Sequence, residues 1–554
     1  MAISLTAEQK SLSRLFAQRE QYIIPNYQRP YSWGLEQCGK LYDDINEAFN
    51  ADTDYFLGNI ILAVGERTKD KPRVVDGQQR LISIWLIFKV LSILKPDVKI
   101  LSDAIQSYNW DGSGPEIKVF SEVIESDDKK ILNDLLGWEK SNFDFYLKQY
   151  TKTDGSFVYP DREKKIIANG LYFYHAYKNF LQSCSDDEFR EYLRFFLEQV
   201  SILPIELIGS NQEEANDRAL TIFETINNRG MDLADADIFK ARLYVKAITE
   251  ADKEEFIELW RKFKEAAENI HLTIDDVFRY YSHILRGGLG STKNEISLRE
   301  FFSTANSPIS QKDYKEVMSD LMRITMLLTE YDELKWSRTE LAAWLQLIDA
   351  YTNTYPRYAV LVYLFHHGFG DEKSLLNNLR SIVRYCYQRG STTYVKFEIY
   401  NMIKQISQNK PLNPYYNDSL KNDDLNYLGR LKYAYALLAQ YLEYPRGIQA
   451  DYCVDRLLSN RDEWNLDDSW KQHSLYNHLD DLGNLAVLDT YKVSKIYADK
   501  QKVYVKTSIS ELHLFLENNP KMISYDALMK RTERKKQLII NFFQGIGEYG
   551  ENRD

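Results

Sequence analysis

The chain is poor in cysteine and has no long apolar run. Its four cysteines lie far apart among 554 residues, and no two form a Cys-x-x-Cys pair: they are Cys38, Cys184, Cys386 and Cys453. This spacing argues against a zinc ribbon and a disulfide scaffold. No apolar stretch approaches a membrane span, and the N-terminus lacks the basic region and apolar core of a secretory signal. We therefore expect a cytoplasmic protein without membrane segments.

The chain also lacks an excess of positive charge, because its formal net charge is −11. The molecule as a whole gives no support for nucleic-acid binding, so any such contact requires a local basic patch. Hydrophobic residues make up 44% and charged residues 27%, as in an ordinary soluble globular protein. The length predicts roughly three or four domains or subdomains.

The most informative stretch is residues 74–81, Val-Val-Asp-Gly-Gln-Gln-Arg-Leu. Two β-branched residues lead into Asp76, which suits a helix N-cap, and Gly77 permits a tight turn from strand to helix. Apolar residues at spacings of three and four then predict a helix with one buried face. These are Leu81, Ile84, Trp85, Phe88 and Leu91.

The start of this helix has the chemistry of a phosphate or nucleotide site. Its first turn offers free backbone N–H groups and the positive end of a dipole. Arg80 adds a cation, and the amides of Gln78 and Gln79 can contact a base edge or a ribose. The other interpretation is a capped helix with a surface arginine. The residues by themselves favour this second interpretation.

Two further blocks carry similar polar groups. Residues 24–33, Ile-Pro-Asn-Tyr-Gln-Arg-Pro-Tyr-Ser-Trp, alternate aromatic residues with Gln28 and Arg29. They form either an aromatic loop clamped to a core or a stacking and charged surface. Residues 227–230, Asn-Asn-Arg-Gly, stand between two predicted helices. A helix C-cap explains Gly230 but does not require Arg229.

Together with Phe-Leu-Gly at 56–58, these blocks resemble the N-terminal domain of GmrSD-type restriction proteins, whose fold is similar to ParB and sulfiredoxin. The resemblance implies a site for a nucleoside triphosphate with Mg²⁺, with Asp76 and Arg80 needed for hydrolysis. Asp76 would orient the turn, water or a metal ion. The implied nucleotide-binding residues are Gln28, Arg29, Gly58, Gly77, Gln78, Gln79, Asn227, Arg229 and Gly230.

The C-terminal region resembles, more weakly, the His-Me-finger nuclease domain that accompanies such N-terminal domains. The block around Gly-Asn-Leu at 483–485 carries this resemblance. Arg456, after Asp455, stands where the resemblance places the base histidine. An arginine stays protonated near neutral pH and cannot act as a base. We therefore expect an inactive nuclease-like domain, and His473 or His478 is the alternative base.

A basic run in the last predicted helix is the candidate nucleic-acid contact. It is either a phosphate-facing patch or a solvated helix face. Its residues are Lys530, Arg531, Arg534 and Lys535. The sequence assigns no metal ligands.

The predicted fold class is α+β. The expected domains are a ParB/sulfiredoxin-like nucleotide-binding core (1–105), a helical extension completing that site (106–245), an all-helical spacer (246–449) and a degenerate His-Me-finger-like domain (450–554). The leading hypothesis is an NTP-binding and NTP-hydrolysing anti-phage defence protein whose nucleotide state controls its engagement of DNA or a protein partner. An active, NTP-dependent and modification-dependent DNA endonuclease is one alternative. A nucleotide-sensing scaffold for a separate effector is another, and oligomerisation is left open.

Overall fold

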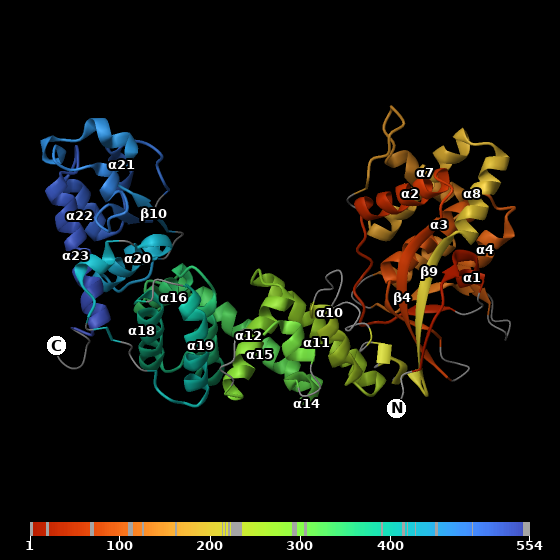
Figure 1. Ribbon diagram of the computed structural model, residues 1–554, viewed down its shortest axis with the longest axis horizontal. Coiled ribbons are helices and arrows are strands. Elements are labelled where there is room, and N and C mark those ends of the chain that lie inside the picture. Colours follow the sequence, from red (N-terminus) through yellow and green to blue (C-terminus); the bar gives the residue numbers. More distant parts are fainter. Residues whose placement is uncertain are drawn as a thin grey trace. The chain divides into compact units, whose positions relative to one another are not determined.

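The structure is a computed structural model that describes residues 4–17, 21–66, 71–108, 115–123, 127–160, 163–212, 214–216, 218–219, 222, 235–290, 296–303, 307–388, 392–412, 416–417, 419–426, 428–448, 452–489 and 491–546. The chain divides into two compact units, residues 1–261 and 262–554. Figure 1 draws the first largely in red to yellow and the second in green to blue. Among the helices described, none is long and apolar enough to cross a membrane.

A mixed sheet forms the framework of the first unit. In the described residues it has seven strands in the order β1-β9-β4-β5-β3-β8, with β2 also paired to β9. Strand β5 lies between β4, to which it is antiparallel, and β3, to which it is parallel. The strands are β1 (Ser4–Ala7), β2 (Lys10–Ser11), β3 (Tyr22–Ile24), β4 (Tyr55–Gly65), β5 (Arg73–Asp76), β8 (Val119–Ser121) and β9 (Val200–Gly209).

This sheet joins the two segments that the sequence predicts as a core (1–105) and an extension (106–245). Strands β8 and β9 come from the second segment, and β9 runs parallel to β4 in the interior of the sheet. The two segments therefore share one framework, within the compact unit of residues 1–261. A small hairpin of β6 (Gln106–Tyr108) and β7 (Pro115–Ile117) stands outside the sheet.

Ten helices are described along this part of the chain, and the last of them crosses the boundary between the two units. They are α1 (Leu12–Ala17), α2 (Leu35–Asn50), α3 (Gln78–Leu94), α4 (Lys99–Ile105), α5 (Asp128–Leu136), α6 (Lys140–Gln149), α7 (Lys165–Ser183), α8 (Asp186–Glu198), α10 (Asp235–Val245) and α11 (Glu250–Asn269). Leu12, Leu15 and Phe16 predict an amphipathic helix over residues 1–20. Residues 4–7 and 10–11 instead pair with β9 as strands, and the helix α1 begins at Leu12. An edge of the sheet supplies backbone partners there that a helix would forgo.

Helix α3 is buried on every side. The sequence predicts one buried face, and that face is buried, with Trp85 at 0% exposure. The remaining sides are covered as well, and only three of its 17 residues are not buried. A helix that is hydrophobic all round belongs inside a core. Even Lys89 is enclosed, and its ammonium group donates to the carbonyls of Leu136 and Trp138 at 2.8 Å each.

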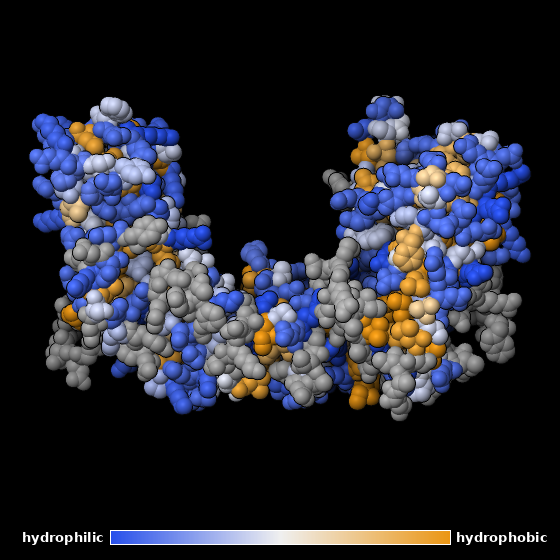
Figure 2. All heavy atoms as spheres, viewed as in Figure 1, coloured by the Kyte–Doolittle hydropathy of each residue, from blue (hydrophilic) through white to orange (hydrophobic). Residues whose placement is uncertain are grey.

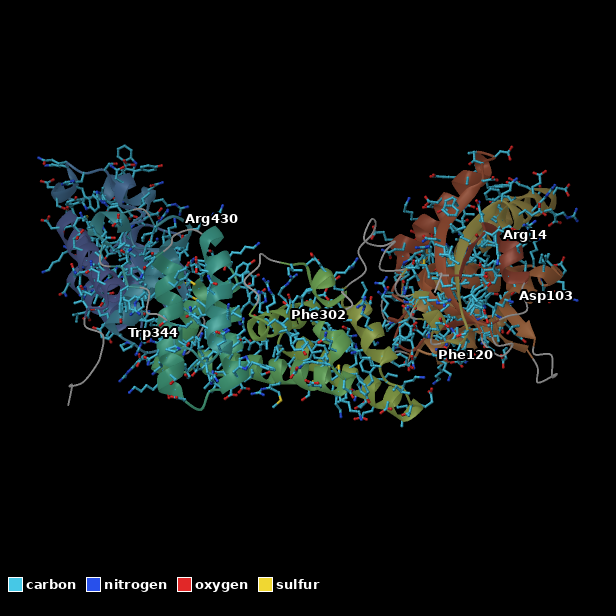
Figure 3. All side chains as sticks on the ribbon, turned by 60° about the horizontal axis from the view of Figure 1, so that its bottom comes forward. Arg14, Asp103, Phe120, Phe302, Trp344 and Arg430 are labelled. Carbon is cyan, nitrogen blue, oxygen red and sulfur yellow. The ribbon has the colours of Figure 1, made fainter. Side chains whose placement is uncertain are left out.

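The second unit is mostly helical. Its helices are α12 (Ile274–Gly288), α13 (Leu298–Ser303), α14 (Pro308–Gln311), α15 (Tyr314–Lys335), α16 (Glu340–Ala350), α17 (Tyr355–His367), α18 (Glu372–Gln388), α19 (Thr392–Ser407), α20 (Lys432–Glu443), α21 (Tyr497–Tyr504), α22 (Ser510–Asn518) and α23 (Tyr525–Gln544). Aromatic side chains fill the spaces between them, as Phe302 and Trp344 illustrate in Figure 3. Phe302 packs edge-on against Phe278, and Trp344 packs against Phe542.

A two-stranded antiparallel hairpin interrupts the helices of this unit. Strand β10 (Cys453–Arg456) pairs with β11 (Leu485–Leu488), and α21 follows in the chain. Short 3-10 turns accompany the hairpin, and they include η2 (Gly429–Leu431), η3 (Asn460–Asn465), η4 (Asp468–Trp470) and η5 (Leu475–His478). The α+β class is thus confirmed, while the ParB-like and His-Me-finger-like assignments stay predictions.

The basic run of α23 corrects one expectation. Arg531 and Lys535 are 3% and 1% exposed, so they cannot form a phosphate-facing patch. Arg531 makes a two-pronged ion pair with Glu511 of α22, at 2.8 and 2.9 Å, and also donates to the carbonyls of Gly483 and Leu485. Lys535 donates to the Leu485 carbonyl at 3.1 Å, and burial lowers its pKa to about 7. Sequence periodicity could not reveal this, because the partners lie 20 to 50 residues away.

The two other members of that run are exposed. Arg534 pairs with Glu443 at 2.7 Å and with Glu511 at 2.6 Å, and Lys530 lies at the surface. Glu511 therefore neutralises a cluster of cations, and their charges outweigh the effect of burial and hold its pKa well below the usual range. The cluster fixes α22 and α23 against β11.

We predict that Glu511→Ala destabilises the C-terminal part of the second unit by about 3–5 kcal/mol, because it leaves buried cations uncompensated. Urea unfolding followed by hydrogen exchange of peptides from residues 452–546 measures this. Glu517→Ala on the same helix is the control: its side chain is 55% exposed, so its loss should cost less than about 0.5 kcal/mol. Equal effects of the two substitutions would contradict the assignment.

Candidate functional site

The turn between β5 and α3 is the centre of the candidate site. Strand β5 ends at Asp76, and α3 begins at Gln78. Gly77 connects them in the left-handed conformation, with φ 87° and ψ 11°. A Cβ atom at this position would overlap Cγ2 of Ile60 on β4. Both the backbone angle and the close packing therefore require glycine.

The first turn of α3 presents its N–H groups at this point. The first intrahelical hydrogen bond runs from Leu81 N to the Gly77 carbonyl, at 3.0 Å. The N–H groups of Gln78, Gln79 and Arg80 precede it and so have no acceptor within the helix. They lie at the positive end of the helix dipole, beside the end of β5. This is the geometry that favours an anion.

Arg80 is held against the neighbouring strand β4. Its Nη1 donates to the carbonyl of Asn59. Next to it, Gly58 has φ 104°, and a Cβ atom there would come 3.1 Å from Nη1 of Arg80. The pairing of β4 shifts register between Phe56 and Asn59, which makes room for the guanidinium group. The structure thus brings together Gly58 and Arg80, which the sequence predicts as site residues.

Asp76 lies in the field of two arginines. Burial raises the pKa of its half-buried carboxyl group, and this effect is larger than any other. The charge of Arg80, a hydrogen bond from the Gly77 backbone and the charge of Arg29 oppose it and lower the pKa. Arg29 is exposed. The predicted residues Asp76, Arg80 and Arg29 therefore share one electrostatic neighbourhood.

The three glutamines predicted to contact a nucleotide hold the loop at 24–33 in place. Gln28 Nε2 donates to the Val75 carbonyl at 2.9 Å, beside Asp76. Gln78 Nε2 donates to the carbonyl of Arg29 at 3.1 Å. Gln79 Oε1 accepts from the backbone N–H of Ser32 at 2.8 Å. In this structure their amides position Arg29 beside the turn, and their contact with a nucleotide stays a prediction.

Two residues that sequence reasoning missed complete this support. Asn169 of α7 is fully buried and donates to the Tyr31 hydroxyl at 3.0 Å and to the Trp33 carbonyl at 2.8 Å. Asp128 of α5 accepts from the Tyr31 backbone at 2.7 Å. The signal for Asn169 was a lone amide inside an apolar helical pattern, since such a group needs a partner when it is buried.

The predicted Asn227, Arg229 and Gly230 lie outside the described residues. Helix α10, which follows them in the chain, does contact the loop at 24–33. The Asn26 amide lies 2.5 Å from the Tyr244 hydroxyl, and the rings of Tyr27 and Tyr244 are 5.4 Å apart.

The predicted degenerate nuclease positions lie at the end of β10. Arg456 donates to Asp480 at 3.0 Å through Nε and at 2.5 Å through Nη2. Asp455 accepts from Lys500 at 3.1 Å and from the Tyr504 hydroxyl at 2.7 Å. Both side chains are thus engaged in ion pairs.

The alternative base residues have local partners. Nδ1 of His478 lies 2.8 Å from an oxygen of Asp481, and His473 stacks on Tyr525 with ring centres 3.6 Å apart. Among the described residues, no group of three or more His, Cys, Asp or Glu side chains is placed to hold a metal ion.

We predict that Gly77→Ala destabilises the first unit by about 2–5 kcal/mol, through backbone strain and overlap with Ile60. Gly155→Ala is the matched control, because Gly155 has φ 83° but no atom near its Cβ position. That substitution should cost only the backbone strain, about 1–2 kcal/mol. Hydrogen exchange of α3 peptides in urea measures both. A cost at Gly77 no larger than at Gly155 would show that the packing against Ile60 is unimportant.

No curated protein matches the chain. A family model described as GmrSD restriction endonuclease, N-terminal domain, matches residues 12–244. This range contains the sheet, the Asp76–Arg80 turn and the loop that the glutamines hold. The match supports the GmrSD-type restriction family for this part of the chain.

Proposed function

We propose that this restriction-type defence protein binds a nucleoside triphosphate at the Asp76–Arg80 turn and hydrolyses it. The nucleotide state would control how the protein engages DNA or a protein partner. One observation carries the proposal: the carboxyl group of Asp76 interacts with the Gly77 backbone N–H, just before α3, and with the charges of Arg80 and Arg29. The family match over residues 12–244 supports a defence role.

The binding contribution of each group follows from its position. The N–H groups of residues 78–80 donate hydrogen bonds to a phosphate at the positive end of a buried helix. Arg80 and Arg29 supply charge-assisted hydrogen bonds to the outer phosphates. The glutamine bonds to the loop fix Arg29 before the ligand arrives, so less conformational entropy is lost on binding.

Asp76 is the group that would activate water. The water oxygen attacks the γ-phosphorus, the bond from that phosphorus to the bridging oxygen breaks, and the nucleoside diphosphate leaves with the bridging oxygen. The proton of the water passes to the Asp76 carboxylate. A carboxyl group whose pKa is raised by burial is a better proton acceptor than an exposed one. Mg²⁺ would neutralise charge on the substrate phosphates. It would be held mainly by these phosphates and by water, as is usual for this ion.

The nuclease-like region would not cleave DNA in this proposal. Arg456 is at the position where the resemblance places the base, and it is paired with Asp480. A protonated guanidinium group cannot accept a proton from water near neutral pH.

Arg80→Ala should lower NTP hydrolysis by about 10²–10³-fold, because it removes a cation aimed at the developing phosphate charge. Phosphate release at saturating NTP and Mg²⁺ measures it, with circular dichroism as a check of the fold. Arg73→Ala is the matched control: Arg73 lies on β5, the strand that leads into this turn, but pairs with Glu122 at 3.3 Å. Hydrolysis unchanged in Arg80→Ala would overturn the proposed site.

The pH dependence tests the role of Asp76. Burial raises its pKa, so the acidic limb of kcat should lie above the value of about 3.9 for an exposed aspartate. The charge of Arg29 lowers this pKa, so Arg29→Ala should move the limb to higher pH. Asp76→Asn should abolish turnover. A limb that does not move in Arg29→Ala would assign it to another group.

A further inference from the structure

Three cations gather around one carboxylate and one tyrosine ring in the second unit. Asp480 accepts from Arg456 and from Lys432, with a distance of 3.0 Å to the Lys432 ammonium group. The ring of Tyr433 has the ammonium groups of Lys432 and Lys492 at 5.4 and 5.8 Å from its centre. One carboxylate offsets one of these charges, so the cluster is locally positive on a chain whose net charge is −11.

This cluster lies beside the β10–β11 hairpin, which α20 contacts. Arg456 is the last residue of β10. Cys453, the first residue of β10, has its pKa raised by burial, while the charge of nearby Lys492 lowers it. The other acidic groups of the hairpin are engaged elsewhere: Asp455 with Lys500 and Tyr504, and Asp489 with Thr507 and Ser508.

An exposed aromatic side chain adjoins the cations. Tyr491 precedes Lys492 and is 70% exposed, and Tyr433 is 44% exposed. Arg430, labelled in Figure 3, lies in η2, directly before α20 and Lys432, and is exposed. In Figure 2 the visible surface of this end of the chain is predominantly hydrophilic. Lys492 is exposed, and Lys432 and Arg456 are partly exposed. Aromatic rings among accessible cations are typical of surfaces that bind unpaired bases and phosphates.

We propose that the surface formed by Lys432, Tyr433, Arg456, Tyr491 and Lys492 binds single-stranded nucleic acid. The three cations contact successive phosphates, and Tyr491 stacks on a base. Arg456 thereby binds phosphate at the position where a hydrolytic base is expected. The inference extends the proposed function, because it names the surface that engages nucleic acid, but it does not depend on NTP hydrolysis.

Single strands are favoured over duplex because a stacking ring needs an unpaired base. The strongly acidic remainder of the chain repels nucleic acid, so binding has to depend on this local cluster. Each lysine that contacts a phosphate contributes about 0.7 to the slope of log affinity against log salt on a single strand.

The test is fluorescence anisotropy with the full-length chain, without nucleotide, using labelled oligo(dT), oligo(rU) and a duplex of equal length at several salt concentrations. We expect either single strand to bind more tightly than the duplex. Lys432→Ala with Lys492→Ala should reduce the salt slope by about 0.7 for each lysine and weaken binding by about tenfold or more. Tyr491→Ala should weaken binding by about tenfold with the slope unchanged.

The control pair is Lys471→Ala with Lys521→Ala, exposed lysines of the same unit, which changes the net charge equally. Absence of single-strand binding, a preference for duplex, or equal loss in the control pair would overturn the inference. Arg80→Ala separates the two proposals: it should leave single-strand binding intact, while Lys432→Ala with Lys492→Ala should leave NTP turnover intact.

Discussion

The burial of helix α3 is the constraint on which the candidate site depends. With apolar side chains packed on all its sides, the helix cannot slide or rotate without opening the core. Its first residue is therefore fixed relative to the sheet, and Gly77 makes the connection to β5 short enough for the helix start to lie beside β4. The proposed phosphate site needs no separate scaffold, because the packing that stabilises the fold also holds the N–H groups in position.

The polar side chains around the start of α3 have two different roles: the amides fix the backbone, and the arginines supply the charge. Gln28, Gln78 and Gln79 bond to backbone atoms of β5 and of the loop at 24–33, and Asn169 fixes the same loop from α7. The two arginines carry the charge. Because the amides bond to the backbone of the loop, the backbone of Arg29 is fixed in position, although its side chain is exposed. The amides thus keep the backbone of the site rigid, and the arginines can extend towards a ligand.

The sequence predicted the parts of this site that depend on local chain geometry. The strand-to-helix turn was predicted from a β-branched pair, Asp76, Gly77 and the apolar helical pattern. Gly58 and Arg29 were predicted as site residues from the resemblance to the family. The remainder depended on contacts between distant segments. Asn169 and Asp128 gave only a weak local signal. The helix predicted near the N-terminus forms only from Leu12, and the residues before it form strands because β9, about 200 residues later, offers backbone partners. The basic run of α23 was misread for the same reason, since Glu511 lies on another helix.

The buried cations of α23 separate the residues that fold the β10–β11 hairpin from those on its outer surface. Arg531 and Lys535 donate to backbone carbonyls of residues 483 and 485, and the fully buried Asn484 bonds to the backbone at Leu458 and Leu479. The architecture of the hairpin is therefore anchored from within, at positions other than Arg456. Substitutions on its outer surface can alter or abolish a reaction while the fold is retained. In such a module, selection for folding and selection for surface chemistry act on separate sets of side chains.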